Sequence, residues 1–234
     1  MNTHWRRVSR LLRERFWAPE CQLCGGPGIG PGICRGCYKD LPRATSTCCC
    51  CAAALPHPGL CGACLVRPPP FHTALVPFVY VFPVDRLLQR LKYDGHLEHG
   101  RLLGELLGHY LRHRAGAVDA IVPVPLHRNR WRKRGFNQAA ELARWVSRVT
   151  EIPVAATVCR RLTDTPPLWS QSPRDRRRLL GGAFESCGYS AGKRLAVIDD
   201  ILTTGSTASA VAASLLKAGA ASVTIWAVAR STGA

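Results

Sequence analysis

The stretch that decides the fold runs from Leu195 to Thr207 and reads LAVIDDILTTGST. Its first four residues are apolar, which predicts a buried strand. Asp199 and Asp200 follow where that strand is expected to end, and a loop rich in hydroxyl side chains comes next. The alanine- and leucine-rich segment AVAASLLKAGA after the loop predicts a helix that stops near Gly219.

A strand, a polar loop and a helix in this order can hold a phosphate. The first turn of a helix leaves backbone N–H groups without partners and carries the positive end of the helix dipole. Gly205 lets the backbone come close, and four hydroxyl side chains surround it: Thr203, Thr204, Ser206 and Thr207. Carboxylates cannot hold an anion, so we expect the two Asp residues to bind two sugar hydroxyls, or a Mg²⁺ that shares them. The alternative is an ordinary strand end followed by a capped helix.

Length and composition limit the class of protein. The 234 residues are 47% hydrophobic with a mean hydropathy of -0.02, which predicts one or two globular domains. No apolar run is long enough to cross a membrane, and the basic N-terminus lacks the apolar centre of a secretory signal. We therefore expect a cytoplasmic protein. The formal net charge of +17 indicates anionic partners, either a polyphosphate or nucleic acid.

Cysteines dominate the N-terminal part of the chain. Ten of the twelve lie in residues 21–64, and eight of these form two units of spacing CxxC-x₉-CxxC. Without secretion, this pattern predicts two closed, structural zinc sites in a reducing compartment, and ligand pairing across the two units stays open. The expected zinc ligands are Cys21, Cys24, Cys34, Cys37, Cys48, Cys51, Cys61 and Cys64.

The proline run at residues 68–70 predicts a stiff linker between two domains. We expect an N-terminal domain over residues 1–67, with an amphipathic helix at residues 5–17 and a double zinc ribbon, and a second domain over residues 71–234. That helix packs on its own domain or lies on a membrane surface. Apolar patterns in the second domain predict strands over residues 74–82, 118–124, 154–158 and 222–228, and helices over residues 87–92, 97–113 and 138–149.

A basic segment, LHRNRWRKRGFNQ, follows the strand expected at residues 118–124. We interpret it as a loop whose arginines neutralise a pyrophosphate, since Arg suits bidentate phosphate contacts. A solvated charge run and a DNA-contact loop with Trp131 and Phe136 as stacking residues are the alternatives. A second arginine cluster lies at residues 174–178, inside a long proline-containing segment that predicts a lid. Cys159 and Cys187 are expected to be small buried residues.

The motif from Leu195 to Thr207 resembles, at every position, the motif of type I phosphoribosyltransferases that binds 5-phosphoribosyl 1-pyrophosphate (PRPP). The resemblance implies an α/β fold with a parallel sheet, flanking helices and a hood. It places Asp199 and Asp200 at the ribose 2′ and 3′ hydroxyls of Mg²⁺-bound PRPP. The 5′-phosphate would be held by Thr203, Thr204, Gly205, Ser206 and Thr207.

The chain from about residue 20 to 230 is similar to the ComF family, also described as ComF/GntX-like, which joins a double zinc ribbon to a phosphoribosyltransferase domain. The family is linked to DNA uptake during natural competence. The resemblance is carried by the doubled CxxC units, the PRPP motif, Leu91–Tyr93, Pro123–Leu126, Arg134–Gln138, Thr165–Pro167 and Gly182–Phe184. Leu168, Ser170 and Leu179 stand where the family usually has Gln, Gly and Asn, so two amide donors of the lid segment are missing here.

Three functions remain open at this point. In the first, Asp199 and Asp200 are catalytic residues of a phosphoribosyltransferase, acting by positioning and electrostatics, and Arg134 holds the departing pyrophosphate. The acceptor cannot be read from the residues. In the second, a non-catalytic protein of the transformation machinery binds single-stranded DNA through its basic loops or ribbon. In the third, the ribbon docks a competence helicase-type partner.

Overall fold

The computed structural model describes residues 19–164 and 179–232. The helix expected at residues 5–17, the arginine cluster at 174–178, Thr165–Pro167, Leu168 and Ser170 lie outside the described residues. The chain divides into two compact units, Met1–Leu41 and Pro42–Ala234.

Within the described ranges, no helix combines the length and the apolar character needed to cross a membrane.

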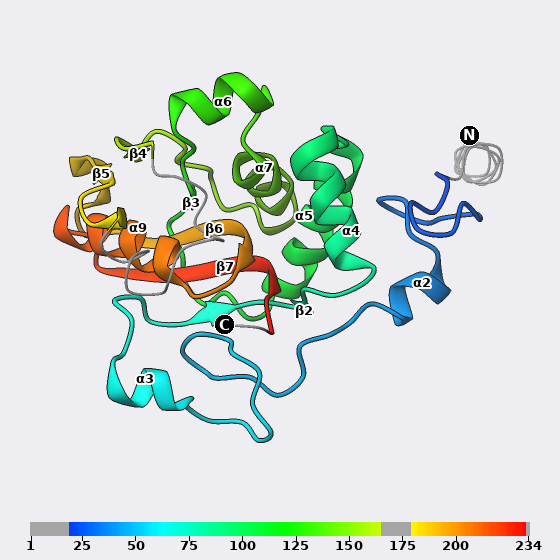
Figure 1. The fold of residues 1–234 in the computed structure, drawn as a ribbon, viewed down its shortest axis with the longest axis horizontal. Coiled ribbons are helices and arrows are strands. Elements are labelled where there is room, and N and C mark those ends of the chain that lie inside the picture. Colours follow the sequence, from blue (N-terminus) through cyan, green and yellow to red (C-terminus); the bar gives the residue numbers. More distant parts are fainter. Residues whose placement is uncertain (1–18, 165–178, 233–234) are drawn as a thin grey trace, which may run out of the picture. The chain divides into compact units, whose positions relative to one another are not determined.

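The larger unit is built on a five-stranded parallel sheet, which confirms the predicted α/β class. Its order is β1 (Ala74–Leu75), β7 (Ser222–Arg230), β6 (Arg194–Leu202) and β3 (Ala120–Pro123), and β2 (Phe78–Val79) also pairs with β7 (Figure 1). The central strands β6 and β7 are apolar on both faces, as a covered parallel sheet requires, so they form the middle of the core.

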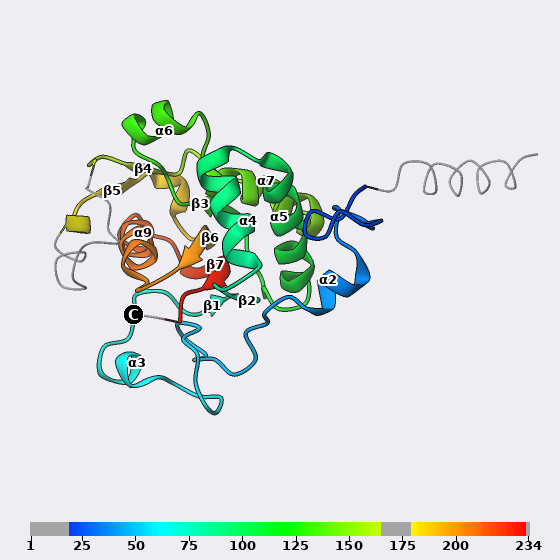
Figure 2. The same ribbon diagram turned by 45° about the vertical axis from the view of Figure 1, so that its right-hand side comes forward.

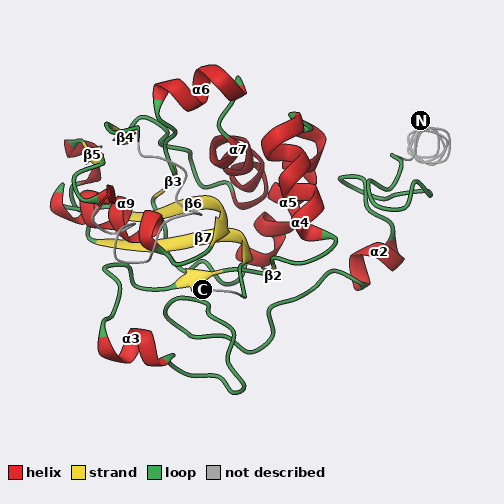
Figure 3. Cartoon of the chain, in the orientation of Figure 1, coloured by secondary structure: helices red, strands yellow, loops and turns green. Residues whose placement is uncertain are grey.

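Helices cover both faces of this sheet. Figure 2 shows α9 (Ser206–Lys217) on one side, and α4 (Val84–Gln89), α5 (Leu97–Leu111) and α7 (Gln138–Thr150) on the other. Figure 3 shows the same layers coloured by secondary structure. The helices predicted after the PRPP-type motif and at residues 97–113 and 138–149 are confirmed, with ends that differ by a few residues.

Glycines let α5 and α7 approach closely. Gly100, Gly104 and Gly108 recur every fourth residue, so they form one stripe along α5. A Cβ atom at Gly104 would lie 2.6 Å from the Cβ of Trp145, and one at Gly108 would lie 2.7 Å from the Cβ of Val149. These distances are shorter than van der Waals contact, so α5 and α7 can pack this closely only with glycine at these positions.

Three local predictions are corrected by the structure. The basic segment is not a loop, since Arg128–Arg134 forms the helix α6. The strand expected at residues 74–82 is split into β1 and β2, which flank Val76 and Pro77. Residues 154–158 make a single bridge, between Val154 and Ile121, because the chain turns immediately afterwards.

A separate antiparallel pair lies at the base of the segment predicted as a lid. Its strands are β4 (Cys159–Arg161) and β5 (Phe184–Ser186). Cys159 is buried as expected, whereas Cys187 is exposed. The remaining short helices are α2 (Arg35–Lys39), α3 (Gly62–Val66), the π-helix η1 (Arg90–Asp94) and the 3₁₀-helix η3 (Gly188–Ser190).

The second cysteine unit, residues 48–64, shares the compact unit and the core of the sheet. The Thr73 hydroxyl donates a 2.7 Å hydrogen bond to the Cys49 carbonyl. Just before the unit, the Pro42 carbonyl accepts a 2.8 Å hydrogen bond from the Val79 N–H. Ala52, between the ligand cysteines, is buried in the main hydrophobic cluster. The division into domains at residues 1–67 and 71–234 stays a prediction.

Candidate functional site

Two adjacent carboxylates lie near the carboxyl end of β6, which runs two residues beyond them to Leu202. Asp200 is 5% exposed, and Asp199 is half-buried and accepts a 2.9 Å hydrogen bond from the Asp200 N–H. Burial raises the pKa of Asp199 well above its ordinary value, and the charge of Asp200 adds to this effect. The sequence-predicted acid pair is therefore one that takes up a proton or a cation readily.

A lysine from a distant segment faces this pair. The Lys92 ammonium, on η1, lies 3.6 Å from the Asp200 carboxylate. The charge of Asp200 raises the pKa of Lys92, although burial opposes the shift. Lys92 belongs to a segment that resembles the family, but the sequence predicts no role for its side chain. A π-helix turn often marks a functional position, but no local sequence pattern predicts where such a turn forms.

The hydroxyl-rich loop leads directly into α9. Gly205 is the N-cap residue with a φ of +74°, a conformation that favours glycine. The Thr204 and Ser206 hydroxyls lie 2.9 Å apart, and the Ser206 N–H donates to Thr204 at 3.4 Å. Thr203 is exposed, and Thr207 is half-buried at the first turn of α9. The loop thus gathers hydroxyls and the N–H groups of a twelve-residue helix beside the acids.

Arg230 anchors the back of this loop. Its Nη1 donates to the Leu202 carbonyl at 2.8 Å and also to the Thr203 carbonyl. The Leu202 carbonyl also accepts a 3.1 Å hydrogen bond from the Ser231 N–H, so Arg230 and its neighbour together fix where the loop leaves the sheet. Its place at the end of β7, 27 residues after Thr203, is a long-range relation that the sequence does not reveal.

The RGFNQ motif forms the turn between α6 and α7. Gly135, with φ of +81°, ends α6, and Asn137 caps α7 while its amide donates to the Val124 carbonyl at 3.0 Å. Arg134 donates to the buried side chain of Gln138. Burial lowers the pKa of Arg134, and the nearby charge of Asp200 opposes this shift. Arg134 is thus held in electrostatic reach of the acid pair.

Asp164 ties α6 to the chain beyond β4. Its Oδ2 accepts a 2.8 Å hydrogen bond from the Asn129 amide and lies 3.4 Å from the His127 ring, while Oδ1 lies 3.8 Å from Arg130. The hydrogen bond from Asn129 is the main cause that lowers the pKa of Asp164. This network was not predicted, because its partners are about 35 residues apart in sequence.

Arg161 adds a further cation near the acids. Its guanidinium lies over the Phe184 ring, 5.4 Å from the centroid, and donates to the Thr163 carbonyl at 3.2 Å. Burial and the charge of Arg130 lower the pKa of Arg161, and the charges of Asp164 and, to a smaller extent, Asp199 oppose this shift. The acid pair therefore has a cation near each member: Lys92 beside Asp200, and Arg161 within electrostatic reach of Asp199.

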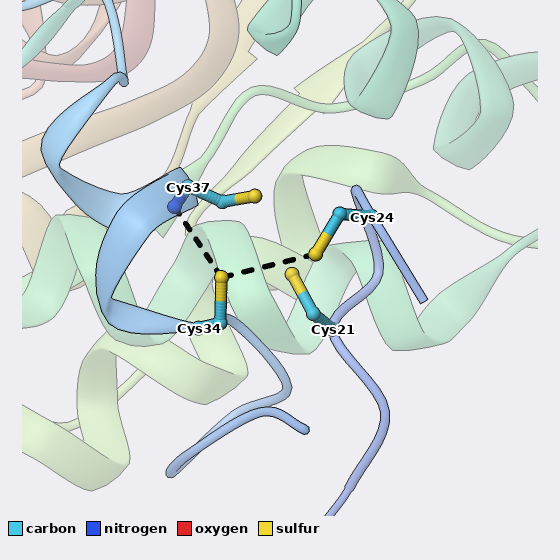
Figure 4. A group of neighbouring side chains, drawn as sticks. All are labelled: Cys21, Cys24, Cys34 and Cys37. Carbon is cyan, nitrogen blue, oxygen red and sulfur yellow. Dashed lines mark hydrogen bonds between the residues drawn. The ribbon is translucent and has the colours of Figure 1, made fainter. Parts of the chain in front are cut away.

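The first cysteine unit gathers its four thiols at one point. Figure 4 shows the sulfur atoms of Cys21, Cys24, Cys34 and Cys37 facing one another, and all lie within 4.8 Å. The Sγ atoms of Cys24 and Cys34 are 3.8 Å apart, and a tetrahedral ion with Zn–S bonds of about 2.3 Å needs about 3.8 Å between sulfurs. Hydrogen bonding with Cys34 and then Cys24 raises the pKa of Cys37 to about 12, so a cation is needed before all four thiols ionise.

The second unit repeats this geometry with Cys48, Cys51, Cys61 and Cys64, again within 4.8 Å. Cys51 and Cys61 are 3.6 Å apart. Each unit therefore closes on itself, which decides the pairing that the sequence left open. Both Cys₄ clusters are compatible with a zinc ion, and four thiolates leave no coordination position for a substrate. The metal would thus fold its unit rather than take part in a reaction.

The fold and the site define a class: an α/β protein with a parallel sheet, an acid pair and hydroxyl loop at the sheet's carboxyl end, and two Cys₄ clusters. A scan against models of known protein families finds no match. Competence protein F of Haemophilus influenzae is 32% identical over 208 residues, covering 85% of this chain and 90% of that protein. DNA utilization protein YhgH of Escherichia coli K12 is 32% identical over 218 residues, covering 90% and 96%. The chain belongs to this ComF/YhgH family of competence proteins.

Similarity to three further proteins is more limited. Competence protein ComFC of Bacillus subtilis is 36% identical over 113 residues, which cover 47% of this chain and 44% of that protein. Among solved structures, a glutamine PRPP amidotransferase from Bacillus subtilis has a TM-score of 0.39 at 20% identity and covers 55% of this chain and 25% of that one. The purine phosphoribosyltransferase of Pyrococcus horikoshii has a TM-score of 0.34 at 17% identity, covering 68% and 89%.

Proposed function

We propose that the carboxyl end of β6 binds PRPP with Mg²⁺. Asp199 and Asp200 would meet the ribose hydroxyls, directly or through the ion, because ionised carboxylates only accept hydrogen bonds and are ligands that Mg²⁺ prefers. The 5′-phosphate would lie against the first turn of α9, where Thr203–Thr207 offers hydroxyls and backbone N–H groups. The observation that carries the proposal is an acid pair, half-buried at Asp199 and buried at Asp200, followed within five residues by a helix whose N-cap residue is Gly205.

The cations around the acid pair support a diphosphate rather than a simple sugar phosphate. Arg134 and Arg161 both lie within electrostatic reach of the acids. An arginine so placed would hold the pyrophosphate as the bond from its oxygen to ribose C1 breaks and a nucleophile attacks that carbon. The acids would position the ribose and stabilise the cation-like ring. Phosphoribosyl transfer is thus the reaction we propose, with an acceptor that the site does not identify.

Calorimetric titration of PRPP tests this binding, with and without Mg²⁺. The wild type is expected to bind in the presence of Mg²⁺, and Asp199→Asn/Asp200→Asn is expected to lose binding. Asp40→Asn, an exposed carboxyl in the smaller unit, serves as the control. Absence of heat in a folded, zinc-loaded wild type would overturn the proposal. Pyrophosphate release across a panel of nucleobases then tests transfer.

The relatives' names point to a biological setting, because they are called competence and DNA utilization proteins. We propose that this chain also acts in DNA uptake or use. Direct contact with single-stranded DNA is the second candidate function, and α6 favours it. That helix has no buried residue, and it exposes Arg128, Trp131, Arg132 and Lys133, where Trp131 is 55% exposed. Cations beside an exposed aromatic ring form a common platform for single strands.

Fluorescence anisotropy with a labelled single strand tests DNA contact. Replacing Arg128, Arg132 and Lys133 by alanine should weaken binding and reduce its salt dependence, because three phosphate contacts are lost. Arg130 and Arg134 are left in place, since both have partners within the protein. Arg67→Ala, an exposed arginine outside α6, is the control. Equal affinity and equal salt dependence in the triple variant would remove α6 from the binding surface. Docking of a helicase-type partner by residues 1–67 stays a prediction, tested by pull-down after their deletion.

A further inference from the structure

Three metal-ligand side chains meet at the start of α5, apart from the cysteines. His96 is the N-cap residue of α5, and Glu98 and His99 lie in its first turn. One donor atom of each lies within 4.8 Å of the other two. Across residues 19–164 and 179–232, the two cysteine clusters are the other groups with this property. The PRPP proposal uses none of these three residues.

The backbone holds the two imidazoles together. Gly95, with φ of +73°, ends η1 and turns the chain into α5, and the His96 N–H donates to the Arg90 carbonyl at 3.3 Å. The rings of His96 and His99 then stack with centroids 5.2 Å apart. The Nδ1 atom of His96 lies 2.5 Å from Oε1 of Glu98. This hydrogen bond therefore joins two of the three candidate ligand atoms.

We propose that His96, Glu98 and His99 bind one zinc ion, or a neighbouring first-row divalent ion such as Ni²⁺. Two imidazole nitrogens and one carboxylate oxygen are a donor set that zinc takes in three-ligand sites. Zinc–ligand bonds of about 2.0–2.1 Å place the donor atoms of a tetrahedral site about 3.4 Å apart. The ion would replace the proton between His96 and Glu98. The distance from His96 Nδ1 to Glu98 Oε1 would then lengthen from 2.5 Å, and donor atoms that lie up to 4.8 Å apart would move closer together.

The three side chains differ in exposure, and this difference suits the movement of the donor atoms toward an ion. His99 is 4% exposed, so packing fixes its ring. The side chains of His96 and Glu98 are 46% and 56% exposed, so both can rotate without disturbing the core. Three protein ligands leave a fourth position for water or for an atom of another molecule. This open position distinguishes the site from the closed Cys₄ clusters.

The experiment is a calorimetric titration of Zn²⁺ into the tag-free full chain with both Cys₄ clusters already loaded. We expect one further equivalent per chain. His96→Ala and Glu98→Gln alter exposed side chains, so folding should persist. Each should weaken the added equivalent at least tenfold to a hundredfold, since even loss of an outer-shell partner has about that effect. His109→Gln, an exposed histidine on the same helix, should bind as the wild type does.

Two outcomes overturn the proposal. One is a wild type that takes up no zinc beyond its two cysteine clusters. The other is a further equivalent that binds His96→Ala and Glu98→Gln with wild-type affinity, which would assign the ion to other groups. Metal analysis after gel filtration gives an independent count of ions per chain in all four proteins.

Discussion

Replacing Lys92 with methionine removes the charge that faces Asp200 and keeps most of the side-chain volume. The two charged groups are 3.6 Å apart. With an effective dielectric constant of about 20, unit charges at that separation attract by about 4–5 kcal/mol. The Lys92 side chain is 29% exposed and the Asp200 side chain 7%, so water screens part of this attraction. We expect Lys92→Met to lose about 2–3 kcal/mol of stability at neutral pH, somewhat less than a fully buried pair would lose.

The loss should depend on pH in a defined direction. Lys92 lowers the pKa of Asp199, which burial has raised, so its removal raises that pKa further. When folding raises the pKa of a carboxyl group, stability falls as pH rises. The fall begins near the pKa in the unfolded chain, about 3.9, and is complete above the pKa in the folded chain. Lys92→Met should therefore differ little from the wild type in acid and increasingly toward neutral pH. At alkaline pH, the stabilisation that Lys92 gives the folded chain is fully present below its ordinary pKa of about 10.4. It is lost as pH rises through the raised pKa of Lys92 in the folded chain.

Urea unfolding followed by tryptophan fluorescence measures this loss, because Trp226 is fully buried in β7. Lys133→Met makes the same chemical change on an exposed residue of α6 and should leave the transition unchanged. The reasoning is refuted if Lys92→Met unfolds at the wild-type urea concentration at neutral pH. A loss of equal size in acid and at neutral pH would also refute it, since packing rather than charge would then be the cause.

Three further outcomes are expected. Gly104→Ala should destabilise the chain by about 1–3 kcal/mol in urea unfolding through overpacking of α5 against α7, whereas Gly62→Ala, whose added Cβ meets nothing within 4 Å, should be close to neutral. Cys61→Ser should lower the midpoint of the Trp226 transition because its cluster shares the core of the sheet, and Cys34→Ser, in the smaller unit, should not. Asp164→Asn should speed hydrogen exchange in α6 without shifting the global midpoint, since it loosens contacts that lie on the surface.

The parts of the molecule that the sequence predicted well are those that local chemistry determines. The strand before Asp199, the glycine at position 205 and the helix after it follow from apolar runs, turn chemistry and helix propensity within about a dozen residues. The presence of two four-thiol clusters also follows from spacing, because two CxxC turns complete one tetrahedral site, whereas the pairing of the turns within each unit comes from the structure.

The parts that sequence reasoning missed depend on partners that are distant in the chain or on helices without an apolar face. Lys92 meets Asp200, which lies 108 positions later in the chain, and no periodic pattern encodes such a contact. Helix α6 has no buried residue, so its cations resemble a solvated loop, and its ends are set by His127 and Gly135 instead. Residues 154–158 are apolar enough for a strand, but a single bridge to β3 precedes a turn.

The shared core of the second cysteine unit and the sheet has a thermodynamic consequence. A ligand that binds only the folded chain adds RT ln(1 + [L]/Kd) to its stability. Zinc at residues 48–64 and a ligand at the end of β6 would each stabilise the same folded unit. Each would then protect the other's site from unfolding without any contact between them. Oxidation of the thiols would lower the number of chains able to hold the ligand, and abundant ligand would slow the loss of zinc.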